Sequence, residues 1–233
     1  ETPEAHEISQ ALPPLSPSWP RKGPMLAGAA AVGVLLGGLA VLLLQRVDPT
    51  LSSGATLRQS LGLPCFALLP EIGRRALGAL SPEDFVVRRP LSPFAEQIRA
   101  LRAALFFGAH HPRVIAVTAA RPDEAKTVVT LCLARSARMS GERVVAVECD
   151  LRAPAFLERL DGDAGPGLAE LLRGEATLDD VLRKDSLTGM AYVPAGRLTG
   201  DALGLFLSDA MGRMLQTLRQ DHDLVLLDLP PAQ

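Results

Sequence analysis

The stretch Thr118-Ala-Ala-Arg-Pro-Asp-Glu-Ala-Lys-Thr127 decides how the C-terminal half of this 233-residue chain is interpreted. The apolar run Val114-Ile-Ala-Val117 precedes it, and a helical pattern from Lys126 to Ser140 follows it and stops before Gly141. Glycine just beyond the last helical residue is a common way for a helix to end. The stretch is therefore predicted to be a loop that leads from a buried strand into the first turn of a helix.

Similar apolar runs recur further along the chain and alternate with helical patterns. The predicted strands after the first are Val144-Val-Ala-Val147, Ala191-Tyr-Val193 and Leu224-Val-Leu-Leu227, and the predicted helices between them cover about 167–173, 177–183 and 203–219. Strands that are apolar throughout and alternate with helices indicate a parallel sheet covered on both faces. The predicted fold class is α/β with a parallel sheet.

The loop also has the arrangement of a Walker A motif, in which a strand, a short loop and Lys-Thr lead into a helix. The free N–H groups at a helix N-terminus attract phosphate. In such a loop Lys126 would reach the outer phosphates of a nucleotide and Thr127 would hold Mg²⁺. The motif GxxxxGK[ST] requires glycines, however, and this loop contains none.

Acidic residues end two of the predicted strands. Glu148-Cys-Asp150 follows the second strand, and Asp228 ends the last one. Because ligands of α/β sheets bind at the carboxyl ends of the strands, we expect these carboxylates to lie near Lys126. The alternative is that they only cap adjoining helices.

An uncharged run of 20 residues, 25–44, precedes the sheet region. That length spans the roughly 30 Å hydrocarbon core of a bilayer, so we predict a transmembrane helix. A buried core helix would be expected to carry a polar stripe, and a signal peptide would be shorter and would show a cleavage pattern. Ala29, Gly33 and Gly37 share one face, where another helix can approach closely in lipid.

Composition excludes several classes of protein. Lys and Arg number 24 against 26 Asp and Glu, which does not indicate a nucleic-acid binder, and aromatic residues make up only 4%. The three cysteines, Cys65, Cys132 and Cys149, form no CxxC pair, so neither a disulfide framework nor a zinc site is predicted.

Taken together, these motifs resemble the bacterial tyrosine autokinase (BY-kinase) and polysaccharide co-polymerase family. The loop 118–127 resembles the family's TSxxPGEGKST, 148–154 resembles DxDLRxP, and 223–231 resembles its Walker B strand. The Pro-rich residues 11–20 resemble the family's motif ahead of its second membrane helix. Residues 92–102 contain E-x2-R-x2-R, which resembles the family's oligomerisation motif.

The resemblance implies a P-loop NTPase-like domain that uses ATP and Mg²⁺. It assigns nucleotide binding to Pro122, Asp123, Glu124, Ala125, Lys126 and Thr127, metal binding to Thr127, Asp150 and Asp228, catalysis to Lys126, Glu148, Asp150 and Asp228, and oligomerisation to Glu96, Arg99 and Arg102. Glu148 would be the base. The alternative for Glu96, Arg99 and Arg102 is a solvated ion-pair face of a helix.

Three departures from the family pattern bear on activity. Asp123 and Ala125 stand where the family has its two loop glycines, and Glu148 replaces the first Asp of DxDLRxP. The only tyrosine, Tyr192, is predicted to lie inside the fold, and the chain ends before any tyrosine cluster. We therefore expect weak nucleotide binding and a degenerate Walker A loop.

The predicted organisation is an extracytoplasmic Pro-rich tail (1–24), a transmembrane helix (25–44), a juxtamembrane linker (45–90) and an incomplete BY-kinase-like domain (91–233). Residues near the span carry nearly equal positive charge on both sides, so the resemblance supplies the orientation. It places the C-terminal domain in the cytoplasm, at the bacterial inner membrane. The chain is expected to be a piece of a longer protein.

Three functions remain open. The first is a co-polymerase subunit that regulates the chain length and export of an exopolysaccharide or capsule through a degenerate kinase-like domain. The second is an active ATP-dependent tyrosine autokinase. The third is a partitioning ATPase of the deviant Walker type, in which Arg121 would stand at the signature lysine. The expected partners are further copies of the chain, the membrane, and the polysaccharide polymerase and export machinery, with no nucleic acid.

Overall fold

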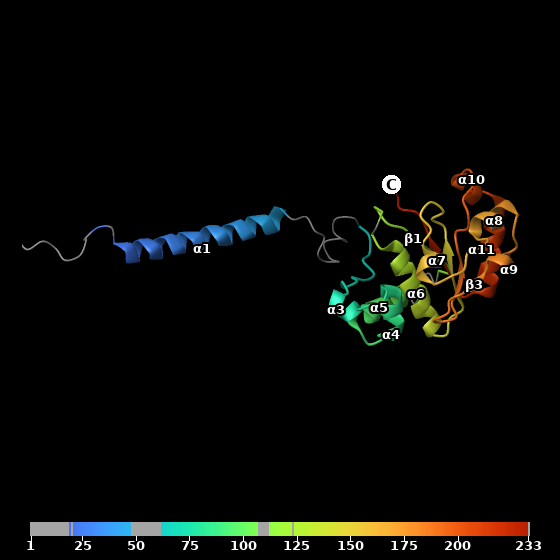
Figure 1. Cartoon of the computed structure of the whole chain (residues 1–233), viewed down its shortest axis with the longest axis horizontal. Helices are drawn as coiled ribbons and strands as arrows, with labels where there is room; N and C mark the ends of the chain where they lie inside the picture. The colour runs from blue at the N-terminus through green and yellow to red at the C-terminus, as the bar shows by residue number, and fades with distance from the viewer. Residues whose placement is uncertain (1–18, 20, 48–61, 107–111, 123, 233) are drawn as a thin grey trace, which may run out of the picture. The chain divides into compact units, whose positions relative to one another are not determined.

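The computed structural model describes residues 19, 21–47, 62–106, 112–122 and 124–232. The chain divides into two compact units, Glu1–Ser53 and Gly54–Gln233, which are described separately. The first unit contains the helix α1, Lys22–Val47 (Figure 1). Its residues Lys22–Val41 are long and apolar enough to cross a membrane, and none of that window is buried. A helix composed mainly of Leu, Ala, Val and Gly, without a polar stripe, is apolar on every face. Such a helix is expected to be buried in protein or in a membrane.

The second unit is built on a five-stranded sheet. Its strands are β1 (Val114–Val117), β2 (Val144–Glu148), β3 (Arg183–Lys184), β4 (Ala191–Val193) and β5 (Leu224–Asp228). The strand order is β1-β5-β2-β4-β3. The first four strands in this order are parallel, and β3 pairs antiparallel with β4. The predicted α/β class with a mainly parallel sheet is confirmed.

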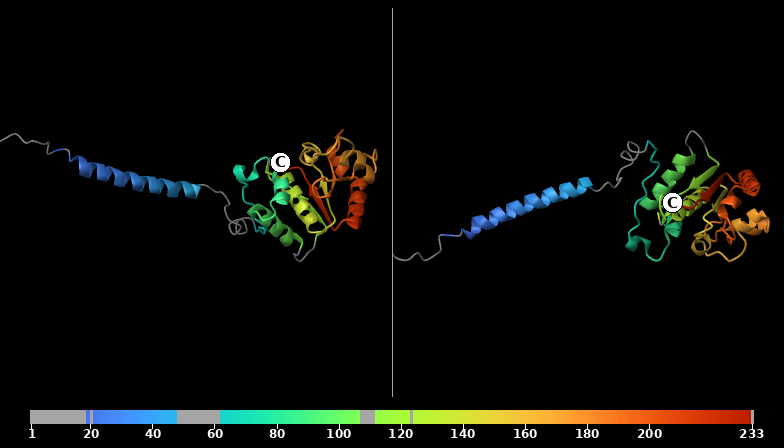
Figure 2. Two further views of the ribbon diagram at one scale, coloured as in Figure 1. Left: turned by 60° about the horizontal axis from the view of Figure 1, so that its bottom comes forward. Right: turned by 90° about the horizontal axis from the view of Figure 1, so that it is seen from above.

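Nine helices of the described residues accompany this sheet. They are α3 (Arg74–Leu77), α4 (Pro82–Arg88), α5 (Pro93–Phe106), α6 (Lys126–Met139), α7 (Phe156–Arg159), α8 (Leu168–Arg173), α9 (Leu178–Val181), α10 (Ala202–Phe206) and α11 (Asp209–Asp221). Figure 2 shows the sheet between helices on both sides.

Alternation along the central strands explains the two helical layers. Val145 and Val147 of β2 pack into a cluster with residues of α8 and α11, whereas Val144 and Ala146 pack into a cluster with residues of α6 and α7. Successive side chains of a strand point to opposite faces of the sheet. Because both faces are covered, every residue of β2 and β5 is buried.

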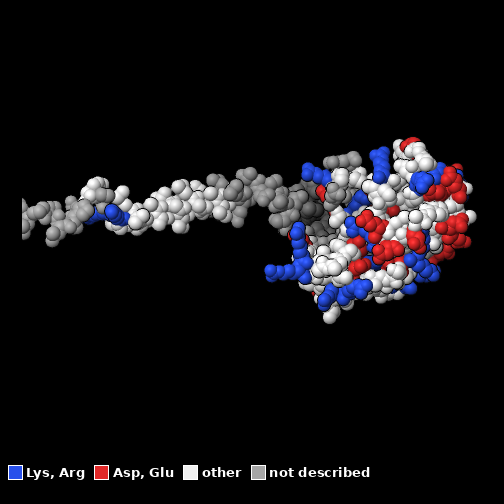
Figure 3. All heavy atoms as spheres, viewed as in Figure 1, with Lys and Arg blue, Asp and Glu red and all other residues white. Residues whose placement is uncertain are grey.

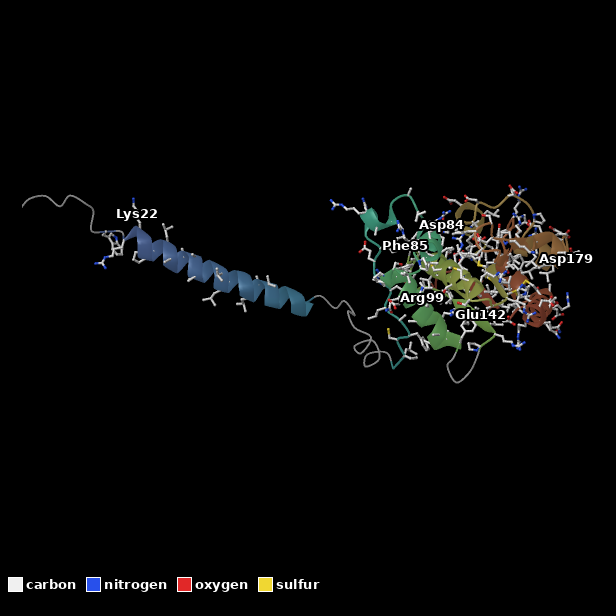
Figure 4. The ribbon with its side chains drawn as sticks, turned by 90° about the horizontal axis from the view of Figure 1, so that it is seen from below. Lys22, Asp84, Phe85, Arg99, Glu142 and Asp179 are labelled. Atoms are coloured by element: carbon white, nitrogen blue, oxygen red, sulfur yellow. The ribbon has the colours of Figure 1, made fainter. Side chains whose placement is uncertain are left out.

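A third cluster joins α4 and α5 to α6. Phe85 of α4 and Ile98 of α5 pack with Cys132 of α6. Figure 4 shows Asp84 and Phe85 on α4 beside the α5–α6 region, and Asp84 pairs with the buried Arg135 of α6 at 2.6 Å. The folded unit thus includes α4, although the sequence assigned residues 45–90 to a linker. Helix α4 has an apolar face that includes Phe85 and Val86, and this face is buried by packing against α5 and α6.

One local prediction was wrong, and two short elements were not predicted. The helix expected over 203–219 is two helices, α10 and α11, because the Ser208 hydroxyl donates to the Leu205 carbonyl and a new helix starts at Asp209. Serine favours such local hydrogen bonds at helix ends. The edge strand β3 and the short helix α7 were not predicted, since two and four residues are too few for a periodic pattern.

Candidate functional site

Lys126, Thr127, Asp150 and Asp228 meet at the carboxyl edge of the sheet. Lys126 and Thr127 begin α6, Asp150 follows β2, and Asp228 ends β5. The Lys126 ammonium lies 2.8 Å from an Asp150 carboxylate oxygen and 3.6 Å from an Asp228 oxygen. The Thr127 hydroxyl donates to that same Asp228 oxygen at 2.7 Å. One cation and one hydroxyl are thus held between two carboxylates.

Asp228 is the most enclosed member of this cluster, with 1% of its surface exposed. Burial raises the pKa of its carboxyl above the ordinary value, and the Thr127 hydrogen bond and the Lys126 charge oppose this rise. A second hydroxyl, on Thr130, lies 3.4 Å from the other Asp228 oxygen. Asp228 therefore stays hydrogen-bonded on both oxygens while facing a cation.

The loop before α6 has a left-handed residue at its end. Ala125, the N-cap of α6, has φ +57° and ψ +21°. That conformation costs a residue with a β-carbon roughly 1–2 kcal/mol relative to glycine. The backbone thus keeps the turn that a Walker A glycine serves, but with alanine in it. Asp123 lies outside the described residues.

Glu124 is bonded within the loop. Its Oε2 accepts the backbone N–H groups of Ala120 at 2.9 Å and Arg121 at 3.1 Å. The carboxylate holds the loop's own turn together in this structure. Pro122, by contrast, lines the cavity beside Lys126.

Glu148 does not join the cluster, although the resemblance assigned it to catalysis. It is 1% exposed, and its carboxylate accepts backbone N–H groups from Ala155, from Phe156 at 2.8 Å and from Ala195 at 2.9 Å. Burial raises the pKa of its carboxyl, against the effect of these three hydrogen bonds. Both oxygens are committed to backbone, so Glu148 fixes the segments that follow β2 and β4 instead of facing the cavity.

A cavity of about 680 Å³ opens at the cluster. Besides Lys126, Thr127 and Asp150, its lining includes Arg152, Arg159, Leu203 and Phe206. None of these last four residues was expected at the site from the sequence. Arg152 had a signal, since it belongs to the stretch that resembles DxDLRxP. Arg159 had none, because it lies on the unpredicted helix α7, where it pairs at 3.0 Å with the buried Glu83 of α4.

The side chains of the cluster would bind a hard cation only together with a bound phosphorylated molecule, which would supply further oxygen atoms. Among the described residues, no group of three or more His, Cys, Asp or Glu side chains is able to hold a metal alone. Hydroxyl and carboxylate oxygens are nevertheless what Mg²⁺ prefers, usually together with substrate phosphates. Thr127, Asp150 and Asp228 therefore fit Mg²⁺ that arrives with a phosphorylated ligand.

The three residues of the E-x2-R-x2-R motif lie on α5, away from the cluster. Glu96 is exposed, and Arg99 donates to the Pro90 carbonyl. Arg102 forms an ion pair with Glu142 within the chain, at 2.5 Å, and Figure 4 shows Arg99 and Glu142 in the same region of the unit. The structure therefore commits Arg102 to its own chain and leaves Glu96 facing solvent.

This sheet order, with Lys-Thr opening the helix after β1 and acids ending β2 and β5, defines a P-loop NTPase-like α/β domain. More particularly, the chain is a homologue of a succinoglycan biosynthesis transport protein and of bacterial tyrosine-protein kinases. It is 29% identical to the succinoglycan biosynthesis transport protein ExoP of Rhizobium meliloti, over 97% of this chain and 32% of ExoP.

Two solved kinase domains share the fold of the second unit. The kinase domain of the Escherichia coli tyrosine kinase ETK matches with a TM-score of 0.68 and 25% identity, over 73% of this chain and 70% of that one. The BceF tyrosine kinase domain matches with a TM-score of 0.69 and 27% identity, over 77% and 76%. No family model matches the chain. The chain spans about a third of the length of the curated relatives it matches.

Proposed function

We propose that the chain is part of an inner-membrane co-polymerase subunit that regulates the length and export of a bacterial exopolysaccharide. Its kinase-like domain would act mainly through assembly with other copies. The biological setting is supported by the relatives, which include a succinoglycan biosynthesis transport protein and a tyrosine kinase. The single observation that supports a degenerate Walker A loop is the left-handed conformation of Ala125 at the start of α6.

The same proposal gives the site a weak affinity for ATP and Mg²⁺. Lys126 would bind the outer phosphates, in place of its present partners Asp150 and Asp228. Thr127 would contribute its hydroxyl to Mg²⁺, with Asp150 and Asp228 as the acidic groups around the metal. Alanine at the turn and a carboxylate at Asp123 would both oppose close approach of phosphate.

Membrane anchoring would come from α1. Its apolar window supports a span, and the orientation with the second unit in the cytoplasm rests on the resemblance. Glu96 and Arg99 would contact neighbouring copies. The partners proposed beyond the chain itself are the membrane and the polysaccharide polymerase and export machinery.

The test compares one single and one double substitution in the bacterium that makes the protein. If assembly is what matters, Lys126→Met leaves the polysaccharide length distribution unchanged, whereas Glu96→Ala with Arg99→Ala alters it. Polysaccharide size is read by gel electrophoresis, and phosphotyrosine is read on the purified protein. A length distribution that changes with Lys126→Met and a loss of phosphotyrosine would contradict the degenerate role.

An active tyrosine autokinase is the second candidate. The observation that favours it is that Lys126 and Thr127 both contact Asp228. This is the arrangement expected of a site for phosphate chemistry. Tyr192 is not a suitable acceptor in this candidate, because the residue is 2% exposed. An acceptor would have to come from elsewhere.

A further inference from the structure

A basic patch lies on the surface formed by α3 and the end of α4. We define it by four arginines, Arg74, Arg75, Arg88 and Arg89, all of them exposed. Within the described residues, no carboxylate lies in salt-bridge distance of any of the four. In the part of the chain that the structure describes, the patch therefore carries positive charge that no ion pair offsets.

The acids of α4 do not neutralise this patch because they are paired on the inner side of the helix. Asp84 pairs with Arg135 at 2.6 Å, and Glu83, which is fully buried, pairs with Arg159 at 3.0 Å. The arrangement sorts the charges of α4, with acids toward the core and arginines toward solvent.

The patch is also hollowed and partly apolar. A cavity of about 630 Å³ is lined by Arg75, Arg88, Arg89 and Leu91, among others. Leu91 is 92% exposed. Cations around a hollow with an apolar side chain beside them suit an anionic headgroup that is attached to hydrocarbon, since Arg binds phosphate oxygens and Leu enters the acyl region.

The rest of the unit is charged in the opposite sense. Figure 3 shows basic side chains gathered over the α3–α4 end and acidic ones gathered at the other end, over α8 and α9. Glu175, Asp179 and Asp180 are exposed there, and Figure 4 places Asp179 at the opposite end of the unit from Asp84 and Phe85. An anionic surface would attract one end of the unit and repel the other.

The chain itself keeps the patch within reach of a membrane. The apolar helix α1 ends at Val47 and α3 begins at Arg74, so fewer than about 30 residues, or on the order of 100 Å of extended chain, connect them. A tethered surface meets the bilayer at high effective concentration, which favours docking without a high intrinsic affinity.

We propose that the basic patch docks on anionic lipid headgroups of the membrane that α1 spans, with Leu91 entering the interface. The proposal rests on the anchoring proposed above. Basic residues next to a membrane segment gain on the order of fivefold in affinity each for an anionic surface. If these gains multiply, four arginines together give roughly several hundredfold, and salt reduces this gain.

The experiment uses the full chain, with Cys65→Ser and Leu91→Cys, labelled at position 91 with the environment-sensitive dye NBD. The labelled protein is reconstituted into vesicles of phosphatidylcholine alone or mixed with phosphatidylglycerol. We expect a blue shift of NBD emission only with phosphatidylglycerol, reduced by high salt but not by an excess of inorganic phosphate. Changing the four patch arginines to Glu should abolish the shift.

The matched control reverses the same number of charges elsewhere. Lys184, Arg197, Arg213 and Arg219 are exposed cations outside the patch, and changing them to Glu should leave the shift intact. Changing the patch arginines to Gln provides a second variant in case the Glu version does not fold, and circular dichroism reports folding in each.

Several results would overturn the proposal. An equal shift in phosphatidylcholine alone, or loss of the shift in the control variant, would remove the role of the patch. No shift in protein that still floats with the vesicles would refute docking but leave the anchoring intact, whereas protein that does not float at all would refute the anchoring. Patch variants that change only the molecular mass in light scattering would assign the surface to contacts between copies.

Discussion

The Thr127 hydroxyl donates a 2.7 Å hydrogen bond to Asp228, a residue 101 positions further along the chain. This bond connects the start of α6 to the end of β5, and it keeps Asp228 beside Lys126. Removing the negative charge of Asp228 should therefore affect the protein in two opposite ways.

Asp228→Asn should stabilise the protein without ligand at neutral pH, even though it damages the site. Burial raises the pKa of Asp228 above the ordinary value of 3.8. A carboxyl with a raised pKa in the folded state takes up its proton there first, so its contribution to stability falls as the pH rises through that pKa. The stability advantage of Asp228→Asn over the original protein should thus grow as the pH rises above 3.8, the ordinary pKa of the carboxyl.

Urea unfolding at several pH values measures this difference. Asp209→Asn, which removes an exposed carboxylate at the start of α11 outside the cluster, is the matched control. An advantage of Asp228→Asn that shrinks as the pH rises would mean that Lys126 and Thr127 outweigh burial.

Glu148→Gln should lower the free energy of unfolding by about 2 kcal/mol or more, because an amide NH₂ would face one of the three backbone N–H groups that the carboxylate now accepts. The exposed Glu158→Gln on α7 should stay within about 0.5 kcal/mol of the original protein. Urea unfolding measures both. If Glu148→Gln left stability unchanged and removed phosphoryl transfer, the catalytic assignment from the sequence would be restored.

The hydrogen-bond partners of Glu148 could not be predicted from the sequence, whereas the members of the cluster could. Lys126, Thr127, Asp150 and Asp228 were predictable as neighbours because the carboxyl ends of parallel strands meet at one edge. The partners of Glu148 depend on where the backbone at Ala155 and Ala195 passes, which no local pattern specifies.

The helices show the same division. The start of α6 at Lys126 was predicted from local residues. The caps of α4 and α5 are local as well, with the Ser81 and Ser92 hydroxyls each accepting a backbone N–H at 3.2 Å, although the sequence predicted a linker over α4. The pairing of Arg102 with Glu142 is 40 positions apart in sequence. The E-x2-R-x2-R motif does not predict such a tertiary contact. Because of it, Arg102 is paired within its own chain, whereas Glu96 faces solvent.

Self-association should depend on Glu96 and Arg99 more directly than on Arg102. Changing both Glu96 and Arg99 to Ala should shift the full chain in detergent toward monomer in light scattering, since Glu96 faces solvent. Arg102→Ala should mainly lower thermal stability, because it leaves Glu142 without its partner. An unchanged mass for the double variant would assign this helix face to solvent.

Cysteine labelling in cells tests the orientation of the chain across the membrane. With Cys65 replaced by Ser, a cysteine at Ser18 should react with a reagent that does not cross the membrane, and one at Ser140 should not. Ser140 is exposed at the end of α6, so burial would not prevent its reaction. Labelling at 140 without labelling at 18 would reverse the proposed orientation.

The most direct test of the account is calorimetry of Mg-ATP binding to the full chain, with and without the two loop glycines. Ala125→Gly relieves a left-handed alanine, worth about 1–2 kcal/mol, and Asp123→Gly removes a carboxylate from beside an anionic ligand. Lys126→Ala in both backgrounds should abolish binding, and Ala100→Gly on α5 controls for a general effect of glycine. The account predicts weak binding by the original loop and a gain of at least about tenfold, or 1.4 kcal/mol, in the double variant. Tight binding by the original loop, or no gain from the glycines, would contradict it.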